Sequence, residues 1–383
     1  MKILFFTPFS RKNGAETALY NIIRNSQHID AAIASGQKGE LLDLVPKQIP
    51  IRIYNRYGIY HRVRFKVHRR LTGENYVFRS LAKEFKGHIW YVNTILQAEV
   101  IRHARKFGVP CVVHLHEMEQ TFAALREDEA HDLVTYPDLI IACSECVASR
   151  LRTLGRAENL EVLHEPVVID DINSSEEGRE KVRNLLGVSP NTFVWAMAGY
   201  IDPNKNASLF VDLARYMLDK EIDSHFVWIG GSGTGYETYV RNKSVEIRVA
   251  NRVTWAGVRD EDYYDYLNAA DGFVLTSTRD SFPLVMVEAA ALCKPIVAFN
   301  SGGVSEFVKP GMGRVVDSWN LADLADAMIS VMTGKIEIDR NSLRRQAEKL
   351  DVSVQVERWE GILRKYVGGD GHPNRGQFSD LPH

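Results

Sequence analysis

Short apolar runs alternate with amphipathic stretches along almost the whole chain. Runs rich in β-branched and aromatic residues predict strands, and stretches with a period near 3.6 predict helices. In the first half the predicted strands are 2–7, 31–35, 50–54, 88–92, 110–115, 138–142 and 160–163, and the helices are 15–26, 76–86, 95–107 and 144–154. In the second half the strands are 192–199, 225–230, 252–255, 272–276, 295–299 and 313–316, and the helices are 205–219, 236–249, 260–270, 283–293 and 319–333. This alternation predicts an α/β fold with parallel sheets covered on both faces.

A polar stretch without periodicity, residues 169–178, separates the two halves. We therefore expect a first domain over 1–168, a second over 174–350 and a C-terminal helix over 351–367. Residues 368–383 are rich in glycine and polar side chains, which predicts a disordered tail.

The composition is that of an ordinary globular chain of 383 residues with a net charge of −2. This charge balance gives no case for a nucleic-acid partner. Four cysteines in a chain of this size do not make a disulfide framework. The first apolar run is too short for a signal peptide, and no run approaches a membrane span. We expect a cytoplasmic protein.

The most informative segment is 278–299, where a turn and a helix follow an apolar strand. Asp280 lies in the turn, Pro283 stands where a helix would start, and Glu288 lies in the helix, eight residues after Asp280. Parallel sheets present ligand groups at the carboxyl ends of their strands, and a helix N-terminus attracts anions. Such a site suits a ligand with hydroxyls at both ends and phosphates between them, such as a nucleotide sugar. The alternative is an ordinary buried βαβ unit with a stray glutamate.

This segment resembles the acidic-x7-acidic signature of glycosyltransferase family 4, a large family of retaining enzymes that use nucleotide sugars. The first acid, usually glutamate in that family, is Asp280, and Pro283 replaces a glycine that often follows the aromatic residue. Both halves of the chain open with a strand, a loop and a helix, so the resemblance covers nearly the whole chain. It implies the GT-B architecture, in which two Rossmann-like domains face each other across a cleft and the C-terminal helix crosses back to the first domain.

The second half carries three further segments of this resemblance. Gly199 to Lys205 is similar to a family segment whose arginine and lysine hold the diphosphate; Lys205 matches, whereas Tyr200 replaces the arginine. Residues 230–233 (Gly-Gly-Ser-Gly) match the glycine-rich loop of the family. Residues 253–259, which end in Val258 and Arg259, resemble the segment that meets the nucleobase.

The first half matches the family at two positions. Asn13-Gly14 is similar to the family's glycine pair at the first βα turn, with asparagine in place of the first glycine, although a plain turn would also explain Gly14. His116, followed by Glu117, corresponds to a His-acid pair near the donor sugar and the acceptor. His114 points the same way as His116 on a strand, so the pair could bind a metal, but no acidic or sulfur cluster in the sequence completes such a site. A hydrogen-bonded structural histidine is the alternative for both.

The resemblance implies the following assignments. The catalytic residues are His116, Lys205, Asp280 and Glu288. The donor-binding residues are Gly14, Lys205, Gly230, Gly231, Val258, Arg259, Asp280, Ser281, Phe282, Leu284, Val285 and Glu288. The acceptor-binding residues are Asn13, His114, His116 and Glu117. No cofactor and no metal is expected, because Lys205 and the helix N-terminus stabilise the departing diphosphate electrostatically.

Two short motifs have plainer explanations than chemistry. Residues 260–262 spell Asp-Glu-Asp, a pattern that binds metals in other glycosyltransferases, but before an amphipathic helix these acids serve as caps and dipole partners. Cys143 and Cys146 form a CxxC without a second one, so Ser144 as a helix cap is the simpler interpretation.

Residues 51–70 carry seven Lys and Arg, no acid and several aromatic residues. Such a segment suits an anionic membrane surface or a diphosphate-linked lipid acceptor, although a solvated basic loop explains it equally well.

The sequence thus predicts a metal-independent glycosyltransferase that moves a sugar from a nucleoside diphosphate sugar to a hydroxyl of a glycan or lipid-linked acceptor, as in polysaccharide or lipopolysaccharide synthesis. The alternatives are a nucleotide-sugar epimerase of the same fold and a non-catalytic subunit of a glycan-assembly complex.

Overall fold

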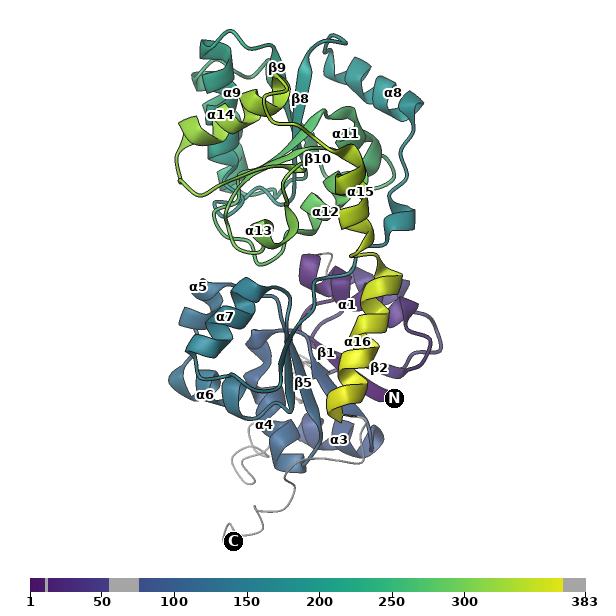
Figure 1. Ribbon diagram of the computed structural model, residues 1–383. Helices are drawn as coiled ribbons and strands as arrows, with labels where there is room; N and C mark the ends of the chain where they lie inside the picture. The colour runs from purple at the N-terminus through teal and green to yellow at the C-terminus, as the bar shows by residue number, and fades with distance from the viewer. Residues whose placement is uncertain (11–12, 55–75, 368–383) are drawn as a thin grey trace. The chain divides into compact units, whose positions relative to one another are not determined.

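The computed structural model describes residues 1–10, 13–54 and 76–367 (Figure 1). The chain divides into two compact units. The first unit is Met1–Pro166 together with the segment that starts at Val352, and the second unit is Val167–Asp351. Most of the basic segment 51–70, residues 11–12 and the tail 368–383 lie outside the described residues.

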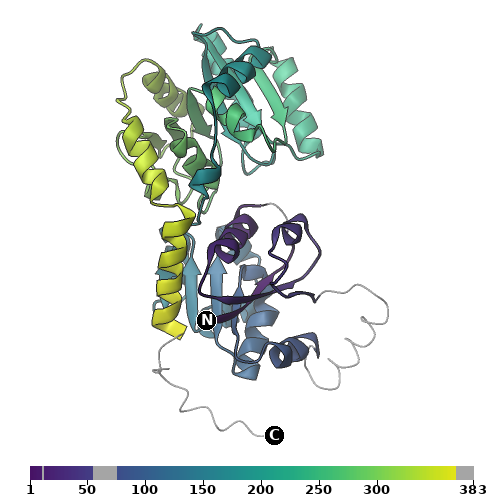
Figure 2. The same ribbon diagram turned by 90° about the vertical axis from the view of Figure 1, so that its right-hand side faces the viewer.

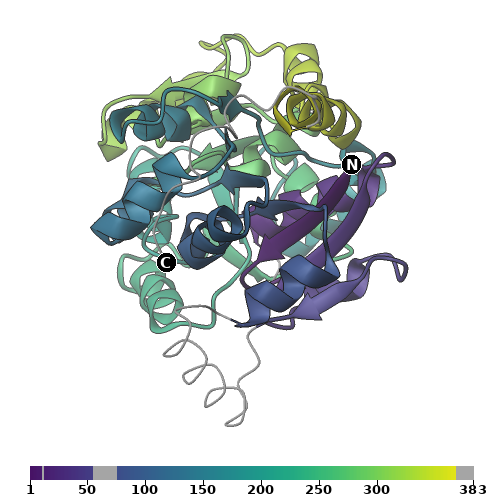
Figure 3. The ribbon, with the colours of Figure 1, turned by 90° about the horizontal axis from the view of Figure 1, so that it is seen from below.

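The first unit is built on a parallel seven-stranded sheet of order β3-β2-β1-β4-β5-β6-β7. Its strands are β1 (Lys2–Thr7), β2 (Asp30–Ser35), β3 (Ile51–Ile53), β4 (Ile89–Val92), β5 (Cys111–Leu115), β6 (Leu139–Ala142) and β7 (Leu160–Val162). Its helices are α1 (Gly14–Asn25), α3 (Tyr76–Glu84), α4 (Ala98–Phe107), α5 (Glu119–Ala123), α6 (Glu127–Thr135), α7 (Glu145–Thr153) and α16 (Val352–Val367), with 3-10 turns η1 (Glu40–Leu44) and η2 (Ile95–Gln97). Seen from below, helices lie on both sides of these strands (Figure 3).

The C-terminal helix α16 returns to the first unit, as the resemblance implied (Figures 1 and 2). It lies beside α1, and Trp359, which is fully buried, packs against Phe5 and Tyr91. The indole Nε1 of Trp359 donates to the hydroxyl of Tyr91 at 3.1 Å. A helix from the far end of the chain therefore completes the core beside β1 and β4.

The second unit is built on a parallel six-stranded sheet of order β10-β9-β8-β11-β12-β13. Its strands are β8 (Phe193–Ala198), β9 (Ser224–Ile229), β10 (Val253–Gly257), β11 (Gly272–Leu275), β12 (Ile296–Phe299) and β13 (Gly313–Val316). Its helices are α8 (Glu176–Leu186), α9 (Ala207–Asp219), α10 (Gly235–Glu246), α11 (Tyr263–Ala269), α12 (Leu284–Ala291), α13 (Val304–Phe307), α14 (Leu321–Met332) and α15 (Arg340–Glu348), after the turn η3 (Ile169–Asp171).

Both sheets have a topological switch point, where successive strands leave in opposite directions. In the first unit it lies between β1 and β4, and in the second between β8 and β11. Ligands of open parallel sheets bind at this point, beyond the carboxyl ends of the strands. The loops that follow these four strands are therefore the places to look for a site.

All thirteen predicted strands are present, and the α/β fold is confirmed. The prediction of a linker over 169–178 was wrong at its C-terminal end, because helix α8 begins at Glu176. Ser175 caps this helix, with its Oγ accepting from the backbone N–H of Gly178 at 2.9 Å. Helices α5, α6, α8, α13 and α15 were not predicted. Among the described residues, no helix is long and apolar enough to cross a membrane.

Candidate functional site

At the switch point of the second unit, a lysine and an aspartate from neighbouring loops form an ion pair. Lys205 Nζ lies 2.5 Å from Asp280 Oδ2, and the two side chains are 21% and 13% exposed. The loops are tied together by the hydroxyl of Thr276, which donates to the carbonyl of Lys205, and by the N–H of Thr278, which donates to the carbonyl of Asn204. The predicted diphosphate cation and the predicted sugar carboxylate are thus held within reach of one ligand.

Lys205 itself does not lie in a helix, although the sequence predicted one over 205–219. Helix α9 begins at Ala207, and Asn206 caps it by accepting from the N–H of Leu209. Lys205 lies in the preceding turn, where Asp202 Oδ1 accepts its backbone N–H at 2.7 Å. The turn places Lys205 directly before the capping residue of α9, and its ammonium group pairs with Asp280.

Asp280 is held by the loop that follows β12. Its N–H donates to the carbonyl of Ser301 at 2.7 Å, and its carbonyl accepts from Gly303 N–H at 3.2 Å. A Cβ at Gly303 would lie 2.2 Å from the carbonyl oxygen of Ser281, so the close approach of the two loops requires a glycine. These bonds fix the backbone on both sides of the Asp280 carboxylate.

The N-terminus of α12 follows directly. The helix begins at Leu284, one residue later than predicted, so Pro283 is its N-cap residue and makes no side-chain cap bond. The first N–H groups of a helix have no partner within the helix. The predicted donor residues Leu284 and Val285 open α12, whereas Phe282 is buried against Phe307 and anchors the turn. The helix end therefore presents backbone donors beside Asp280 and Ser281, as an anion site needs.

Glu288 lies in α12 and receives a hydrogen bond from a residue that the sequence did not reveal. The hydroxyl of Tyr263, the first residue of α11, donates to Glu288 Oε2 at 2.7 Å. Desolvation by burial raises the pKa of Glu288 above its usual range, against the lowering effect of this hydrogen bond. A carboxylate has acceptor sites left after one such bond, so Glu288 can still accept from hydroxyls of a ligand.

A pocket of about 580 Å³ lies in the second unit beside the glycine-rich loop. Its lining residues are Tyr200, Gly231, Ser232, Gly233, Thr234, Glu237, Thr238, Arg241, Gly257 and Val258. Gly231 and Val258 of the predicted donor set meet here. Arg259 does not line this pocket: its guanidinium lies over the ring of Tyr266, and its Nε donates to the carbonyl of Ala256. Gly230 has a packing role, because a Cβ there would lie 2.1 Å from the carbonyl oxygen of Gly199.

The backbone donors of the glycine-rich loop are occupied by a side chain of the same unit. Glu237 Oε2 accepts from the N–H of Ser232 at 2.7 Å and of Gly233 at 2.9 Å, and Arg241 pairs with Oε1. These interactions lower the pKa of Glu237 to about 2. The largest cause is the backbone hydrogen bond from Ser232, and the bonds from Arg241 and Gly233 add to it. Glu237 therefore fixes the shape of the loop, and it takes the donors that a phosphate would need.

In the first unit, His116 follows β5 and lies between two polar side chains. Its Nδ1 lies 2.6 Å from Glu165 Oε1, and its Nε2 lies 3.1 Å from Asn93 Oδ1. Glu165 comes from the segment after β7, and Asn93 directly follows β4. His114 does point the same way, with its ring centroid 4.2 Å from that of His116, and its Nδ1 lies 2.8 Å from the hydroxyl of Tyr91.

Two of the other predicted first-unit residues have structural roles. Asn13 caps α1 by accepting from the N–H of Glu16 at 3.0 Å. Glu117 accepts from the N–H groups of Ile95 and His116 at 3.1 and 3.0 Å. A Cβ at Gly14 would lie 3.8 Å from Glu165 Oε2, so this glycine borders the His116 site. The acceptor roles of Asn13 and Glu117 stay predictions.

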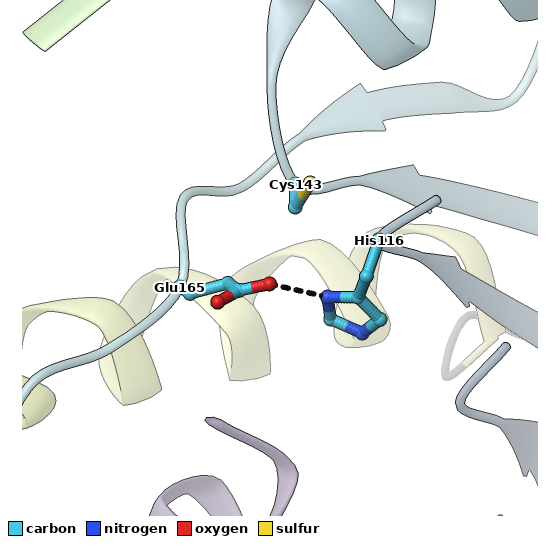
Figure 4. Close-up of side chains that lie close together, drawn as sticks. All are labelled: His116, Cys143 and Glu165. Carbon is cyan, nitrogen blue, oxygen red and sulfur yellow. Dashed lines mark hydrogen bonds and ion pairs between the residues drawn. The ribbon is translucent and has the colours of Figure 1, made fainter. Parts of the chain in front are cut away.

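The described residues contain one group that could hold a metal ion: His116, Cys143 and Glu165, whose ligand atoms lie within 4.8 Å of one another (Figure 4). Two ligands on one tetrahedral zinc are about 3.3 Å apart, because each bond is about 2.0 Å long. His116 Nδ1 and Glu165 Oε1 are 2.6 Å apart, a hydrogen-bond distance. The group is therefore arranged as a hydrogen-bonded pair beside a buried cysteine.

The CxxC motif and the Asp-Glu-Asp motif of residues 260–262 lie at the starts of helices. Ser144 caps α7, with its Oγ accepting from the N–H of Val147 at 3.4 Å, as predicted, and neither Cys143 nor Cys146 is in a disulfide. Asp262 occupies the N-cap position of α11, without a side-chain cap bond, and pairs with Arg259 at 3.3 Å.

Sequence reasoning missed Glu165, Asn93, Tyr263 and Glu237. Asn93 and Glu165 follow predicted strands closely, and that position was a signal that could have marked them. Tyr263 and Glu237 sit in helices at ordinary polar positions, and no spacing identifies them.

Known proteins that are similar to this chain are glycosyltransferases. Residues 178–350 match the family model described as "Glycosyl transferases group 1". The chain is 28% identical over 251 residues to an Escherichia coli UDP-Gal:alpha-D-GlcNAc-diphosphoundecaprenol alpha-1,3-galactosyltransferase, covering 61% of this chain and 63% of that protein. It is 29% identical over 215 residues to a D-inositol 3-phosphate glycosyltransferase of Mycobacterium sp. (strain KMS), covering 55% and 48%. These alignments span about half to two thirds of the relatives' length.

Solved structures share the fold over nearly the whole chain. The structure of Anabaena Alr3699/HepE in complex with UDP superposes with a TM-score of 0.80 at 23% identity, covering 95% of this chain and 100% of that one. The apo form of the lipopolysaccharide outer core galactosyltransferase WaaB superposes with a TM-score of 0.74 at 17% identity, covering 95% and 99%.

Proposed function

We propose that the chain transfers a sugar from a nucleoside diphosphate sugar to an acceptor hydroxyl, with retention of configuration, because residues 178–350 match the group 1 glycosyltransferases and the chain has the GT-B fold. The observation that carries the proposal is the Lys205–Asp280 pair beside the N-terminus of α12, at the switch point of the second sheet. A cation, a carboxylate and backbone donors in one place fit the two parts of such a donor, its phosphates and its sugar.

The difficult step is departure of the nucleoside diphosphate, because negative charge grows on its leaving oxygen. The Lys205 ammonium, which the Asp280 carboxylate holds in an ion pair, and the N–H groups that open α12 stabilise that charge. Asp280 accepts from sugar hydroxyls through the oxygen that Lys205 leaves open, and Glu288, held by Tyr263, accepts from the ribose. Tyr200, 55% exposed, supplies no positive charge to this loop.

We assign the donor to the uridine diphosphate sugars. The structural neighbour Alr3699/HepE is described in complex with UDP, with UDP and glucose, and with UDP-glucose, and the E. coli relative is named for UDP-Gal. That relative also acts on a diphosphoundecaprenol-linked sugar, which supports a glycan or lipid-linked acceptor for this chain.

The experiment measures donor choice before turnover. Calorimetric titration of the purified chain with UDP, GDP, ADP and dTDP should give the tightest binding with UDP. Incubation with UDP-glucose and UDP-galactose, with and without a lipid-linked glycan acceptor, then separates the functions. Acceptor-dependent release of UDP supports transfer. An altered nucleotide sugar without acceptor identifies an epimerase, and UDP binding without any turnover identifies a non-catalytic subunit; either result rejects the proposal.

We also propose that residues 51–70 bring the chain to anionic membranes, where a lipid-linked acceptor would lie. Each Lys or Arg near such a surface contributes about 1 kcal/mol, screened by salt. Sedimentation with anionic vesicles at low salt should therefore recover the protein, less so at high salt and after Arg62, Arg64, Arg69 and Arg70 are changed to Ser. Equal recovery with neutral and anionic vesicles contradicts the proposal.

A further inference from the structure

The hydrogen bonds around His116 determine where its protons lie. The amide nitrogen of Asn93 donates to the carbonyl of Ala15 at 3.2 Å, so its oxygen must be the atom that faces His116 Nε2 at 3.1 Å. An amide oxygen only accepts, and Nε2 must therefore carry a hydrogen. On the other side of the ring, Nδ1 lies 2.6 Å from a carboxylate oxygen of Glu165, which is 3% exposed. An ionised carboxylate also only accepts, so both ring nitrogens donate and His116 is an imidazolium.

The same reasoning gives the opposite answer for His114. The indole of Trp359 can only donate, and it donates to the hydroxyl oxygen of Tyr91 at 3.1 Å. The hydrogen of that hydroxyl then points to His114 Nδ1 at 2.8 Å, which must accept it. His114 therefore carries one proton, on Nε2, and is neutral. Its Nε2 has no hydrogen-bond partner among the described residues.

The two rings lie 4.2 Å apart, so they cannot both be charged without strong repulsion. The fold separates their states by giving each a different partner. His116 faces carboxylates from three elements: Glu165 after β7, Glu16 in α1, and Glu117 at the end of its own strand. The neutral groups beside it are His114, Asn93 and the Cys143 thiol. His114 faces Tyr91, the charged ring and the backbone of Leu163.

We propose that Glu165 is a positioning residue that holds His116 as a doubly protonated hydrogen-bond donor. This inference rests on the proposed function for its consequence: His116 turns Nε2–H from Asn93 to an oxygen of the bound substrate and acts as a fixed positive donor. It does not act as a general base, because neither ring nitrogen has a free lone pair while Glu165 is ionised. Trp359 of α16 takes part indirectly, by keeping His114 neutral through Tyr91.

The electrostatics agree with this geometry. Desolvation by burial lowers the pKa of His116, but the hydrogen bond to Glu165 and the charges of Glu165, Glu117 and Glu16 raise it, and the net shift is upward from the usual 6.5. Burial, and then the charge of His116, lower the pKa of His114 well below 6.5. The charged pair is therefore fully present below pH 6.5 and is lost as the pH rises through the raised pKa of His116.

The test reads the two rings directly by NMR of the chain with ¹⁵N-labelled histidine, assigned by His114→Gln and His116→Gln. At pH 7 we expect two protonated nitrogens on His116 and one on His114, with His116 titrating above 6.5. Glu165→Gln should lower the pKa of His116 to or below 6.5, because the amide removes the neighbouring charge. The control is Glu158→Gln, an exposed change on the other side of β7 that should leave both rings unaffected. A single proton on His116 in the unchanged chain at pH 7 overturns the proposal, even if Glu165→Gln fails to fold.

Kinetics test the consequence separately. Glu165→Gln should lower kcat by about 10²-fold, the effect of misplacing a catalytic group, with little change in the KM for the donor. The high-pH limb of the rate profile should move to lower pH, and Glu165→Asp should restore part of the rate. Unchanged kcat with a lowered His116 pKa rejects the role in catalysis. If the chain transfers no sugar at all, the proposed function fails while the NMR result still decides the charge state.

Discussion

Each unit has an ion pair in the loops that follow its parallel strands, yet the two pairs differ in exposure. Lys205 and Asp280 in the second unit are 21% and 13% exposed, whereas His116 and Glu165 in the first unit are 5% and 4% exposed. A partly exposed pair exchanges partners with a ligand at modest cost, since water and ligand can replace either member. A buried pair is held by the large penalty of leaving one charge unpaired. The comparison indicates that the second unit binds and releases charge, whereas the first unit keeps one charge fixed.

The largest effect is expected at Lys205. If its ammonium stabilises the leaving diphosphate, Lys205→Ala should lower kcat by roughly 10²–10³, the scale for one preorganised donor, and weaken donor binding less. Steady-state kinetics with UDP-sugar measure both effects, and Lys220→Ala, an exposed lysine of the same unit, is the matched control. A change in the KM for the donor alone would make Lys205 a binding residue. The contrast between an exchanging charge in the second unit and a fixed charge in the first unit would then fail.

Glu288 and Tyr263 allow a graded test of nucleotide binding in the second unit. Glu288→Ala should weaken UDP binding by about 1.5–3 kcal/mol, the range for hydrogen bonds to charged groups. Tyr263→Phe leaves the carboxylate but removes the bond that orients it, so the loss should be smaller, about 0.5–1.5 kcal/mol. Calorimetry with UDP gives both values. Normal UDP affinity in a folded Glu288→Ala chain removes Glu288 from the donor site.

Glu237 tests whether the glycine-rich loop is a structural device or a phosphate cradle. Its pKa of about 2 lies below the usual 4.5, so its charge stabilises the fold at pH values above 4.5 and that stabilisation is lost as the pH falls toward 2. Glu237→Gln should lower the free energy of unfolding at pH 7 by about 1 kcal/mol, a typical net hydrogen-bond contribution, with a smaller difference at pH 4. Urea unfolding at both pH values measures this. If Glu237→Gln binds UDP more tightly than the unchanged chain, the N–H groups of the loop donate to the ligand and the loop is a phosphate cradle.

The smallest effect is expected from chelation, since the positive charge in both the Lys205–Asp280 pair and the His116–Glu165 pair comes from a side chain and not from a metal ion. Treatment with EDTA should leave transfer essentially unchanged. Asp262 pairs with Arg259, and His116 Nδ1 is bonded to Glu165, so neither offers a preformed set of ligands. Loss of activity on chelation, restored by manganese, would contradict this.

The strands, and the positions of the second-unit candidate residues relative to them, could be predicted because their signals are local. Asp280, Pro283 and Glu288 lie within nine residues of one another, and their place after a strand gives their position on the sheet. Helix α8 was missed for the opposite reason. Arg179 and Arg183 pair with Asp271 about ninety residues away, so the helix is held by distant charge as well as by an apolar stripe.

The sequence by itself determined the two parallel sheets, the position of Lys205, Asp280 and His116 after their strands, and the family resemblance. Strand periodicity and short motifs depend only on neighbours along the chain. Only the tertiary structure decided the partners of these residues. Glu165 meets His116 across 49 positions, and Trp359 reaches Tyr91 across 268. Protonation depends on such contacts, since burial and hydrogen bonds set which form of a histidine is stable. The charge of the first-unit site is therefore a property of the fold, although each of its residues is visible in the sequence.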